Sequence, residues 1–304
     1  MTEPVIRVGG LRKSYGEVEA VRGIDIEVAP GEVFAFLGPN GAGKTTTVEI
    51  LEGYRPRSDG EATVLGTDPG SAGREWRGRI GIVLQQSKMH PELSVRETLE
   101  MFAGYYSAPL SVADTITQVG LEEKAGTRVA RLSGGQQRRL DVGVALIGDP
   151  ELLFLDEPTT GFDPSARRRF WGMIEGLREL GKTIFLTTHY MEEAQRLADR
   201  VAIIVAGRIA AEGSPDELAG ADGTAATIRF RTPDGELAGL PDGIDPVFDE
   251  AGFATFSAER PVEALHRLTG WALEREVDLQ GLEVRRPSLE DVYLQLIARA
   301  EEQR

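Results

Sequence analysis

Short apolar runs alternate with helix-like stretches along the first two thirds of the chain. Apolar runs bounded by glycine, proline or charged residues predict strands, whereas apolar positions three or four residues apart predict helices. Alternation of this kind predicts a largely parallel sheet covered by helices, with a helical subdomain over about residues 95–147. The predicted strands cover residues 5–8, 24–28, 33–37, 63–65, 80–84, 152–155, 183–186 and 201–205; the predicted helices cover residues 44–52, 94–106, 111–119, 134–147 and 191–198, and two more begin after Asp163 and at Ser214-Pro215.

The chain beyond residue 221 has a different pattern. A polar segment rich in Gly and Ala, residues 219–224, predicts a linker. The sequence therefore predicts two domains, an α/β domain over residues 1–221 and a small α+β accessory domain over residues 222–304. In the second domain the predicted strands cover residues 227–231, 247–256 and 279–284, and the predicted helices cover residues 261–274 and 288–300.

Composition excludes several classes of function. The chain has 304 residues, of which 41% are hydrophobic, enough for a sizeable core. It has no cysteine and three histidines, which excludes disulfides, thiol nucleophiles and thiolate zinc sites. A net charge of −15 disfavours nucleic acid as a partner. No apolar run reaches the ~18–20 residues needed to span a bilayer, and no secretory signal is visible, so we expect a cytoplasmic protein that reaches a membrane only through a partner.

The strongest chemical signal is the segment Gly38-Pro39-Asn40-Gly41-Ala42-Gly43-Lys44-Thr45. It fits the pattern G-x-x-x-x-G-K-[ST] and lies between a predicted strand and a predicted helix. Glycines let backbone N–H groups turn toward phosphate oxygens, and the helix N-terminus favours the same charge. Lys44 is expected to reach the β- and γ-phosphates of a nucleotide, and the Thr45 hydroxyl to hold Mg²⁺. The predicted ATP-binding residues here are Gly38, Pro39, Asn40, Gly41, Ala42, Gly43, Lys44, Thr45 and Thr46.

Two carboxylates follow the apolar run at residues 152–155. A buried strand in this place delivers Asp156 and Glu157 to its carboxyl end, beside the phosphate loop. Asp156 is expected to hold Mg²⁺ through water, and Glu157 to polarise the attacking water as general base. A solvated Asp-Glu pair is common at strand ends, and it is the phosphate loop that favours the catalytic interpretation.

A second phosphate-binding surface is predicted at Leu132-Ser133-Gly134-Gly135-Gln136, 20 residues before that strand. A serine hydroxyl and glycine amides at a helix N-terminus bind anions, although one phosphate loop already serves the chain. The motifs and their order over residues 4–220 resemble those of the ATP-binding-cassette (ABC) ATPases, whose fold is an α/β P-loop domain with an inserted helical subdomain. The resemblance implies that this signature closes over the γ-phosphate of ATP held by a second subunit, in a head-to-tail homodimer around two ATP molecules.

The resemblance assigns further residues. Tyr15 matches the aromatic residue that stacks on adenine, although a core tyrosine would look the same. Gln85 matches the glutamine that reaches Mg²⁺ and the attacking water, and Gln86 leaves a one-residue register open. His189 matches the switch histidine at the γ-phosphate. Asp163, in Gly161-Phe162-Asp163, matches the loop that crosses the dimer, where the family usually has Leu for Phe162, and Asp163 can equally be a helix N-cap. The predicted metal ligands are Thr45, Gln85 and Asp156, and residues 87–100 are expected to contact a membrane partner.

The tail Pro287-Ser288-Leu289-Glu290-Asp291-Val292-Tyr293-Leu294 resembles that of the daunorubicin-resistance type of drug exporter ATPases. A capped amphipathic helix without other meaning has the same pattern. The resemblance implies an ATP-hydrolysing subunit on the cytoplasmic face of the membrane, which drives a separately encoded permease that exports drugs or other hydrophobic substrates.

One alternative is a soluble ABC ATPase acting on nucleic acid or ribosomes. Repair-type members place a long coiled coil between the phosphate loop and the signature, but the 88-residue interval from Lys44 to Leu132 carries no sustained heptads. Translation-type members carry two cassettes in one chain, whereas this chain has one, so both observations disfavour this alternative. A GTPase is excluded, because Asn40 is the only asparagine and the guanine-reading N-K-x-D motif needs another.

Overall fold

The computed structural model describes residues 3–85, 89–219, 225–233, 239–249, 251–285 and 288–302. The chain divides into two compact units, one of Met1–Pro215 with Leu296–Arg304 and one of Asp216–Gln295. The predicted linker and domain boundary fall mostly on residues 220–224, outside the described residues. Within the described residues, no helix combines the length and apolar character needed to cross a membrane.

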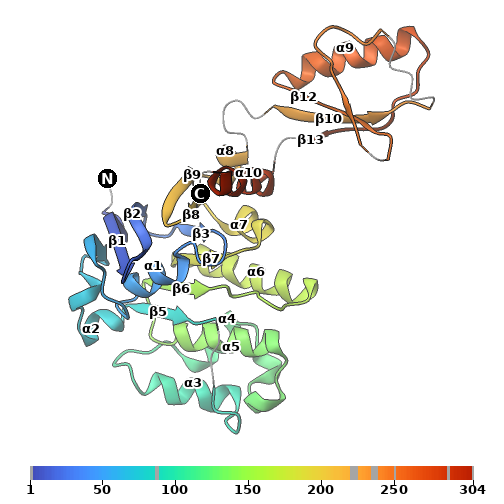
Figure 1. Ribbon diagram of the computed structural model, residues 1–304. Coiled ribbons are helices and arrows are strands. Elements are labelled where there is room, and N and C mark those ends of the chain that lie inside the picture. Colours follow the sequence, from blue (N-terminus) through green and yellow to red (C-terminus); the bar gives the residue numbers. More distant parts are fainter. Residues whose placement is uncertain are drawn as a thin grey trace. The chain divides into compact units, whose positions relative to one another are not determined.

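A six-stranded sheet forms the centre of the first unit (Figure 1). Five strands are parallel, as predicted, and the sixth pairs antiparallel with its neighbour. The inner strands are continuous apolar runs because both faces of the sheet are covered. In order across the sheet they are β5 (Ile80–Val83), β6 (Leu152–Asp156), β7 (Thr183–Thr188), β3 (Val33–Leu37), β8 (Arg200–Val205) and β9 (Arg208–Gly213).

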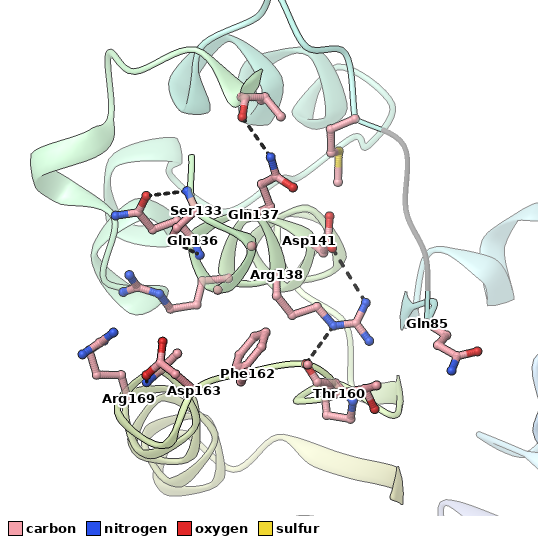
Figure 2. A pocket seen from close by; sticks show the side chains of 18 of the residues that line it. Gln85, Ser133, Gln136, Gln137, Arg138, Asp141, Thr160, Phe162, Asp163 and Arg169 are labelled. Carbon is pink, nitrogen blue, oxygen red and sulfur yellow. Dashed lines mark hydrogen bonds and ion pairs between the residues drawn. The ribbon is translucent and has the colours of Figure 1, made fainter. Parts of the chain in front are cut away.

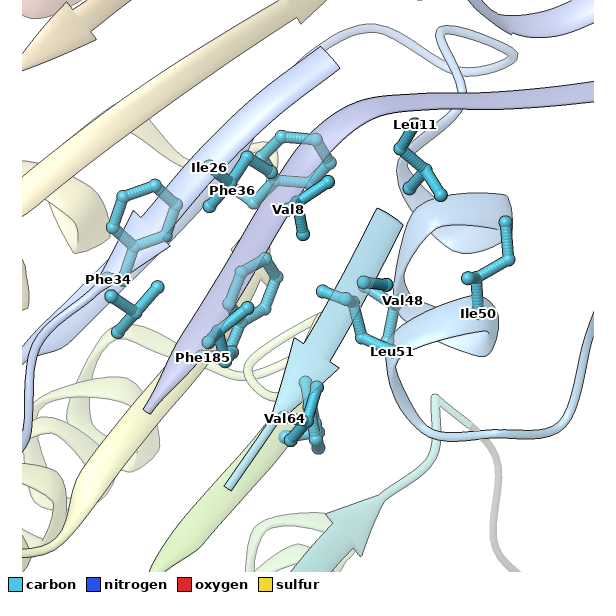
Figure 3. Packing of buried hydrophobic residues seen from close by; sticks show 14 of the residues in the cluster. Val8, Leu11, Ile26, Phe34, Phe36, Val48, Ile50, Leu51, Val64 and Phe185 are labelled. Carbon is cyan, nitrogen blue, oxygen red and sulfur yellow. The ribbon is translucent and has the colours of Figure 1, made fainter. Parts of the chain in front are cut away.

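A cluster of phenylalanine rings packs on one face of this sheet. The ring of Phe185 lies 5.5 Å from that of Phe34 and 5.7 Å from those of Phe36 and Phe154 (Figure 3). All four rings are buried. They belong to a core that includes the helix after the phosphate loop, α1 (Lys44–Leu51), so this packing anchors that helix to the sheet.

A second, antiparallel sheet covers the phenylalanine face, and the sequence predicted only parts of its strands. Its order is β2 (Val18–Val28), β1 (Ile6–Tyr15) and β4 (Asp59–Val64). The predicted strands at residues 5–8, 24–28 and 63–65 were too short. They covered only the most apolar ends, because the remaining positions alternate between buried and exposed and contain many charged residues.

The other face of the main sheet packs against helices. They share a core with Leu153, Leu155, Ile184 and Leu186 of the central strands. The predicted helix over residues 94–106 ends earlier than expected, at its C-cap Gly104. The helices of this part are α3 (Val95–Ala103), α4 (Val112–Gln118), α5 (Gly134–Leu146), α6 (Pro164–Glu179) and α7 (Met191–Leu197), with short turns η2 (Glu122–Lys124) and η3 (Val129–Arg131); elsewhere lie η1 (Pro69–Ser71), α2 (Arg74–Arg77) and α8 (Pro215–Ala219).

The second unit contains a four-stranded antiparallel sheet in the order β11 (Val247–Phe248), β12 (Ala254–Ala258), β10 (Ala226–Arg231), β13 (Gln280–Arg285). The helix α9 (Pro261–Glu274) confirms the predicted bounds. The last helix, α10 (Leu289–Glu302), begins after Ser288 as expected, and its residues from Leu296 onward are assigned to the first unit. The prediction of one continuous strand over residues 247–256 was wrong, because two strands, β11 and β12, occupy this stretch. The Asp249 carboxylate accepts from the N–H groups of Ala251 and Phe253, which makes a turn between two strands.

A buried carboxyl group lies at the end of α1. Glu52 is 5% exposed, and burial, reinforced by Asp156 and Glu49, raises the pKa of its carboxyl from 4.5 to about 8. Between pH 4.5 and 8 the folded state therefore holds a proton that the unfolded state releases. Because the folded state binds more protons, this group makes the protein less stable as the pH rises through that window.

We predict that Glu52→Gln raises the thermal unfolding midpoint at pH 8 and has little effect at pH 4.5. The amide has no charge to desolvate at high pH, whereas at pH 4.5 the wild-type carboxyl is neutral in the folded state and only about half ionised in the unfolded state. Melting curves of both proteins between pH 4.5 and 8.5 measure the difference. An equal difference at every pH would contradict the buried, proton-holding carboxyl.

Candidate active site

The phosphate loop runs from the end of β3 into α1, and two of its glycines are required by close packing. A Cβ at Gly38 would lie 2.3 Å from the Ile204 carbonyl oxygen, and one at Gly43 would lie 2.6 Å from the Ala20 carbonyl oxygen. Gly43 is also the N-cap of α1, with φ of 109°, in the left-handed region. The loop is thus held against the neighbouring backbone at both of its ends.

The Lys44 side chain folds back onto the backbone of this loop. Its Nζ donates to the carbonyl oxygens of Gly38 at 2.6 Å and Pro39 at 3.2 Å. The residue is 7% exposed. Burial lowers the pKa of the Lys44 ammonium, and the carboxylates of Glu157 and Asp156 oppose that shift. The loop lysine and the two predicted carboxylates therefore belong to one electrostatic cluster.

The junction after β6 depends on a residue that the sequence analysis did not single out. The Thr187 hydroxyl, at the end of β7, donates to Asp156 Oδ1 and accepts from the Glu157 N–H at 3.1 Å. Glu157 has φ of 42°, which directs its backbone out of the strand. A threonine where a buried apolar strand ends was the only sequence signal for this contact.

Three side chains converge on the Glu157 carboxylate. Gln85 Nε2 donates to Glu157 Oε2, the Thr160 hydroxyl donates to the same oxygen, and His189 Nδ1 lies beside it, each at 3.3 Å. The Glu157 side chain is 14% exposed. The structure thus brings the predicted residues Gln85, Glu157 and His189 together, from the ends of three different strands. Gln86, the alternative for Gln85, lies outside the described residues.

The signature segment begins α5 and has the predicted cap. Ser133 Oγ accepts from the Gln136 N–H at 3.3 Å, and Gln136 Oε1 accepts from the Ser133 N–H at 2.9 Å. A Cβ at Gly135 would lie 3.3 Å from the Ala166 Cβ, so α5 and α6 approach closely here. The amides of this first turn are held in one orientation.

Asp163 caps α6, the next helix after the carboxylate pair. Its Oδ1 accepts from the N–H groups of Ser165 and Ala166 at 2.9 and 2.8 Å, which lowers the pKa of its carboxyl. Phe162, the departure from the family pattern, packs edge-on against Phe170 with ring centres 5.9 Å apart. The larger residue is therefore accommodated in the core without disturbing the cap.

A cleft of about 1320 Å³ joins these segments (Figure 2). Its lining includes Ser133 and Gln136 of the signature together with Gln85, Glu157 and Asp163. Among the described residues, none of the phosphate loop lines this cleft. Glu157 lines the cleft on the side of the phosphate loop, because its carboxylate interacts with the loop lysine, Lys44.

The remaining predicted residues make no described contact with the Glu157 carboxylate. Tyr15 ends β1 with a 40% exposed ring, and its described contacts are to Lys13 and Arg55 at 5.2 and 5.3 Å, so stacking on adenine stays a prediction. Thr45 is exposed in the first turn of α1, and Thr46 is half-buried beside it. Leu132 is buried in the helical core, and its contact with ATP stays a prediction.

Hard oxygen donors are available for a divalent cation. The Thr45 hydroxyl, the Gln85 amide and the Asp156 carboxylate are ligands of the kind that Mg²⁺ prefers, and Mg²⁺ needs few protein ligands because it retains water. Among the described residues, no group of three or more His, Asp or Glu side chains forms a metal centre by itself. The donor set fits a magnesium ion bound together with nucleotide phosphates.

Glu193 is a second buried residue that the sequence analysis missed. It is fully buried and accepts from Trp171 Nε1 at 3.0 Å. Burial raises the pKa of its carboxyl, while the hydrogen bond from Trp171 and the nearby hydroxyl groups of Thr188 and Thr159 act against that shift. Thr188 precedes His189, and Thr159 lies two residues after Glu157, so this network supports the backbone on both sides of the site.

Comparisons with known proteins show the family to which the chain belongs. The profile of the family described as ABC transporter matches residues 21–160, and one for an ABC-transporter-like C-terminal domain matches residues 226–288. The chain is 40% identical over 309 residues to Nod factor export ATP-binding protein I of Paraburkholderia xenovorans, covering 98% of this chain and 99% of the relative. The same-named protein of Bradyrhizobium diazoefficiens is 40% identical over 308 residues, covering 98% of both.

Solved structures show the same fold for the first unit. A structure described as cbiO1 from Clostridium perfringens, part of the ABC transporter complex cbiONQ, is 27% identical with a TM-score of 0.66, covering 72% of this chain and 92% of that one. The ATP-binding cassette MJ0796, solved as a dimer bound to ADP and Pi, is 24% identical with a TM-score of 0.61, covering 69% and 98%. The chain belongs to the ABC transporter ATPases, and the predicted fold class is confirmed.

We predict that Thr187→Val raises the Mg²⁺ concentration needed for half-maximal ATP hydrolysis about tenfold, because residues that orient a metal ligand typically change affinity by that factor. The change removes the hydroxyl that holds Asp156 and leaves the side-chain volume nearly unchanged. The assay is ATPase rate against Mg²⁺ at saturating ATP. The matched control is Thr183→Val on the same strand, whose equally buried hydroxyl accepts from the Gly31 N–H away from the site. The same Mg²⁺ dependence in both variants would contradict this role.

Proposed function

We propose that two copies of this chain bind two ATP molecules between them, head to tail, and hydrolyse them to drive a separately encoded permease. The observation that carries the proposal is the convergence of Gln85, Thr160 and His189 on the Glu157 carboxylate, beside the loop lysine. The signature supports the composite site, because its capped first turn offers a second set of amides to a phosphate although one phosphate loop already serves the chain. The signature of one subunit then contacts the γ-phosphate of ATP held by the other.

Each residue has a distinct task in this mechanism. Lys44 and the loop amides bind the β- and γ-phosphates, which replace the carbonyl oxygens of Gly38 and Pro39 as partners of the ammonium. Glu157 accepts a proton from the attacking water. Gln85 and His189 hold that carboxylate and the water in line. Thr45, Gln85 and Asp156 would hold Mg²⁺, which when bound would offset the charge that develops on the phosphates.

Export is the direction that the relatives support. Two relatives that cover nearly the whole chain are named Nod factor export proteins, so the likeness includes the second unit. The tail beginning at Ser288 adds the resemblance to drug exporters. The proposed cargo is a drug or other hydrophobic substrate chosen by the permease, and the chain acts on the cytoplasmic face of the membrane. No described feature favours a role on nucleic acid or ribosomes.

We predict that Glu157→Gln lowers the turnover number about 10²- to 10⁴-fold, the usual contribution of a general base. The amide keeps the shape of the side chain but cannot take the proton, so ATP-bound dimers accumulate. Steady-state ATPase assays and size-exclusion chromatography with ATP measure both effects. Glu175→Gln is the matched control, since Glu175 pairs with Arg196 on the surface. Wild-type turnover in Glu157→Gln would refute the general-base assignment.

We predict that Ser133→Arg and Lys44→Ala are each inactive and that mixing them restores ATP hydrolysis. The arginine blocks the signature of its own chain, and the alanine removes the phosphate ligand of the other, so a mixed dimer keeps one intact site. ATPase rate against the mixing ratio is the measurement. No recovery, with both variants folded and able to form mixed dimers, would exclude a site shared between subunits.

A further inference from the structure

An arginine of the signature helix lies buried beneath the catalytic carboxylate. Arg138 is on the second turn of α5, and its side chain is 7% exposed (Figure 2). Its Nε donates to the Pro158 carbonyl oxygen at 3.1 Å. One terminal nitrogen donates to the Leu84 carbonyl oxygen, and the other donates to the Asp156 carbonyl oxygen at 2.6 Å. The carboxylate of Asp141 lies 3.7 Å from the same guanidinium. One planar group thus reaches three separate backbone acceptors.

These acceptors lie where the pairing of two strands ends. The last residue pair between β5 and β6 is Val83 with Leu155. Leu84 and Asp156 are the next residues on each strand, so the guanidinium joins the two chains beyond the ladder. A planar fork with five N–H donors can span such a gap, whereas an ammonium cannot bind the same three directions at once.

The three acceptors also flank the reacting groups. Leu84 precedes Gln85, and Asp156 and Pro158 enclose Glu157 on both sides. Glu157 has a left-handed backbone conformation that the surroundings must maintain. Its backbone N–H is bound by Thr187 on one side, and the carbonyls around it are bound by Arg138 on the other. The direction of its carboxylate therefore depends on both contacts.

We propose that Arg138 is a positioning residue that holds Glu157 and Gln85 of its own subunit in line for hydrolysis, and so links the signature helix to the base of the opposite site. This inference rests on the composite site proposed above. Ser133, at the start of the same helix, contacts the nucleotide that the partner subunit holds. Arg138 instead positions Glu157, which acts on the nucleotide held by its own subunit. Displacement of α5 at one site then alters the base at the other.

The first test separates positioning from nucleotide binding. Arg138→Met lowers the turnover number about 10- to 100-fold, the usual result of misplacing a reacting group by ~1 Å. ATP affinity, measured with the subunit too dilute to dimerise, stays within about twofold, because the phosphate loop is untouched. Arg138→Lys recovers part of the loss, since it keeps the charge and can reach one carbonyl. A variant with wild-type turnover, or one that loses ATP affinity in proportion to its turnover, would overturn the proposal.

A matched control lies at the opposite ends of the same two strands. Arg79, just before β5, pairs with Glu151, just before β6, and also donates to the Leu65 carbonyl oxygen. Arg79→Met removes a guanidinium that joins these strands without approaching Glu157. It is expected to lower the thermal unfolding midpoint and to retain turnover. Equal losses of turnover in Arg79→Met and Arg138→Met would show that Arg138 has only a structural role.

The decisive experiment uses mixed dimers of Ser133→Arg and Lys44→Ala, in which the one working site takes its loop and Glu157 from the first chain and its signature from the second. Adding Arg138→Met to the first chain lowers the recovered activity about 10- to 100-fold, whereas adding it to the second has a smaller effect. The opposite order, or equal effects, would overturn the inference. If Arg138→Met does not fold, Arg138→Lys is compared in the same two positions. Failure of the unaltered mixture to recover activity refutes the composite site instead, so the two proposals fail separately.

Discussion

In-register parallel pairing of β3, β6 and β7 is the constraint on which the rest of the site depends. Leu37 pairs with Thr188, and Asp156 pairs with Thr187, so three strands end at the same level. The phosphate loop, the carboxylates and His189 follow these ends directly. A shift of one strand by one residue would separate the Thr187 hydroxyl from Asp156 and point alternate side chains to the opposite face. The phenylalanine cluster that joins the same three strands opposes such a shift.

Buried ionisable groups surround this edge of the sheet. Lys44, Glu52, Arg138 and Glu193 are all less than a tenth exposed. Removing charges from water destabilises a fold unless each group is paired, hydrogen-bonded or neutral. Lys44 and Arg138 are bound by backbone carbonyls, and the two carboxyl groups have raised pKa values. The Glu157 side chain, to which the chemical step is assigned, is less deeply buried than these four groups, at 14% exposed.

Helix caps prepare the second half of the proposed site. Ser133 and Asp163 satisfy the first amides of α5 and α6, and the two helices approach closely at Gly135. Because these caps are local, the signature keeps its shape in a single subunit and needs no nucleotide to form it. Closure of a dimer can then bring a rigid surface to the γ-phosphate, and Arg138 connects that surface to the ends of β5 and β6.

The sequence by itself determined what depends on neighbouring residues: the phosphate loop, the caps at Ser133 and Asp163, and most helices and inner strands. These follow from glycine geometry, capping and apolar periodicity, which act over a few residues. Tertiary structure alone decided the convergence on Glu157, the contacts of Thr187, Arg138 and Glu193, the length of β1 and β2, and the turn at Asp249. These depend on which strands pair and in which register, and such choices are made by contacts between residues that lie far apart along the chain.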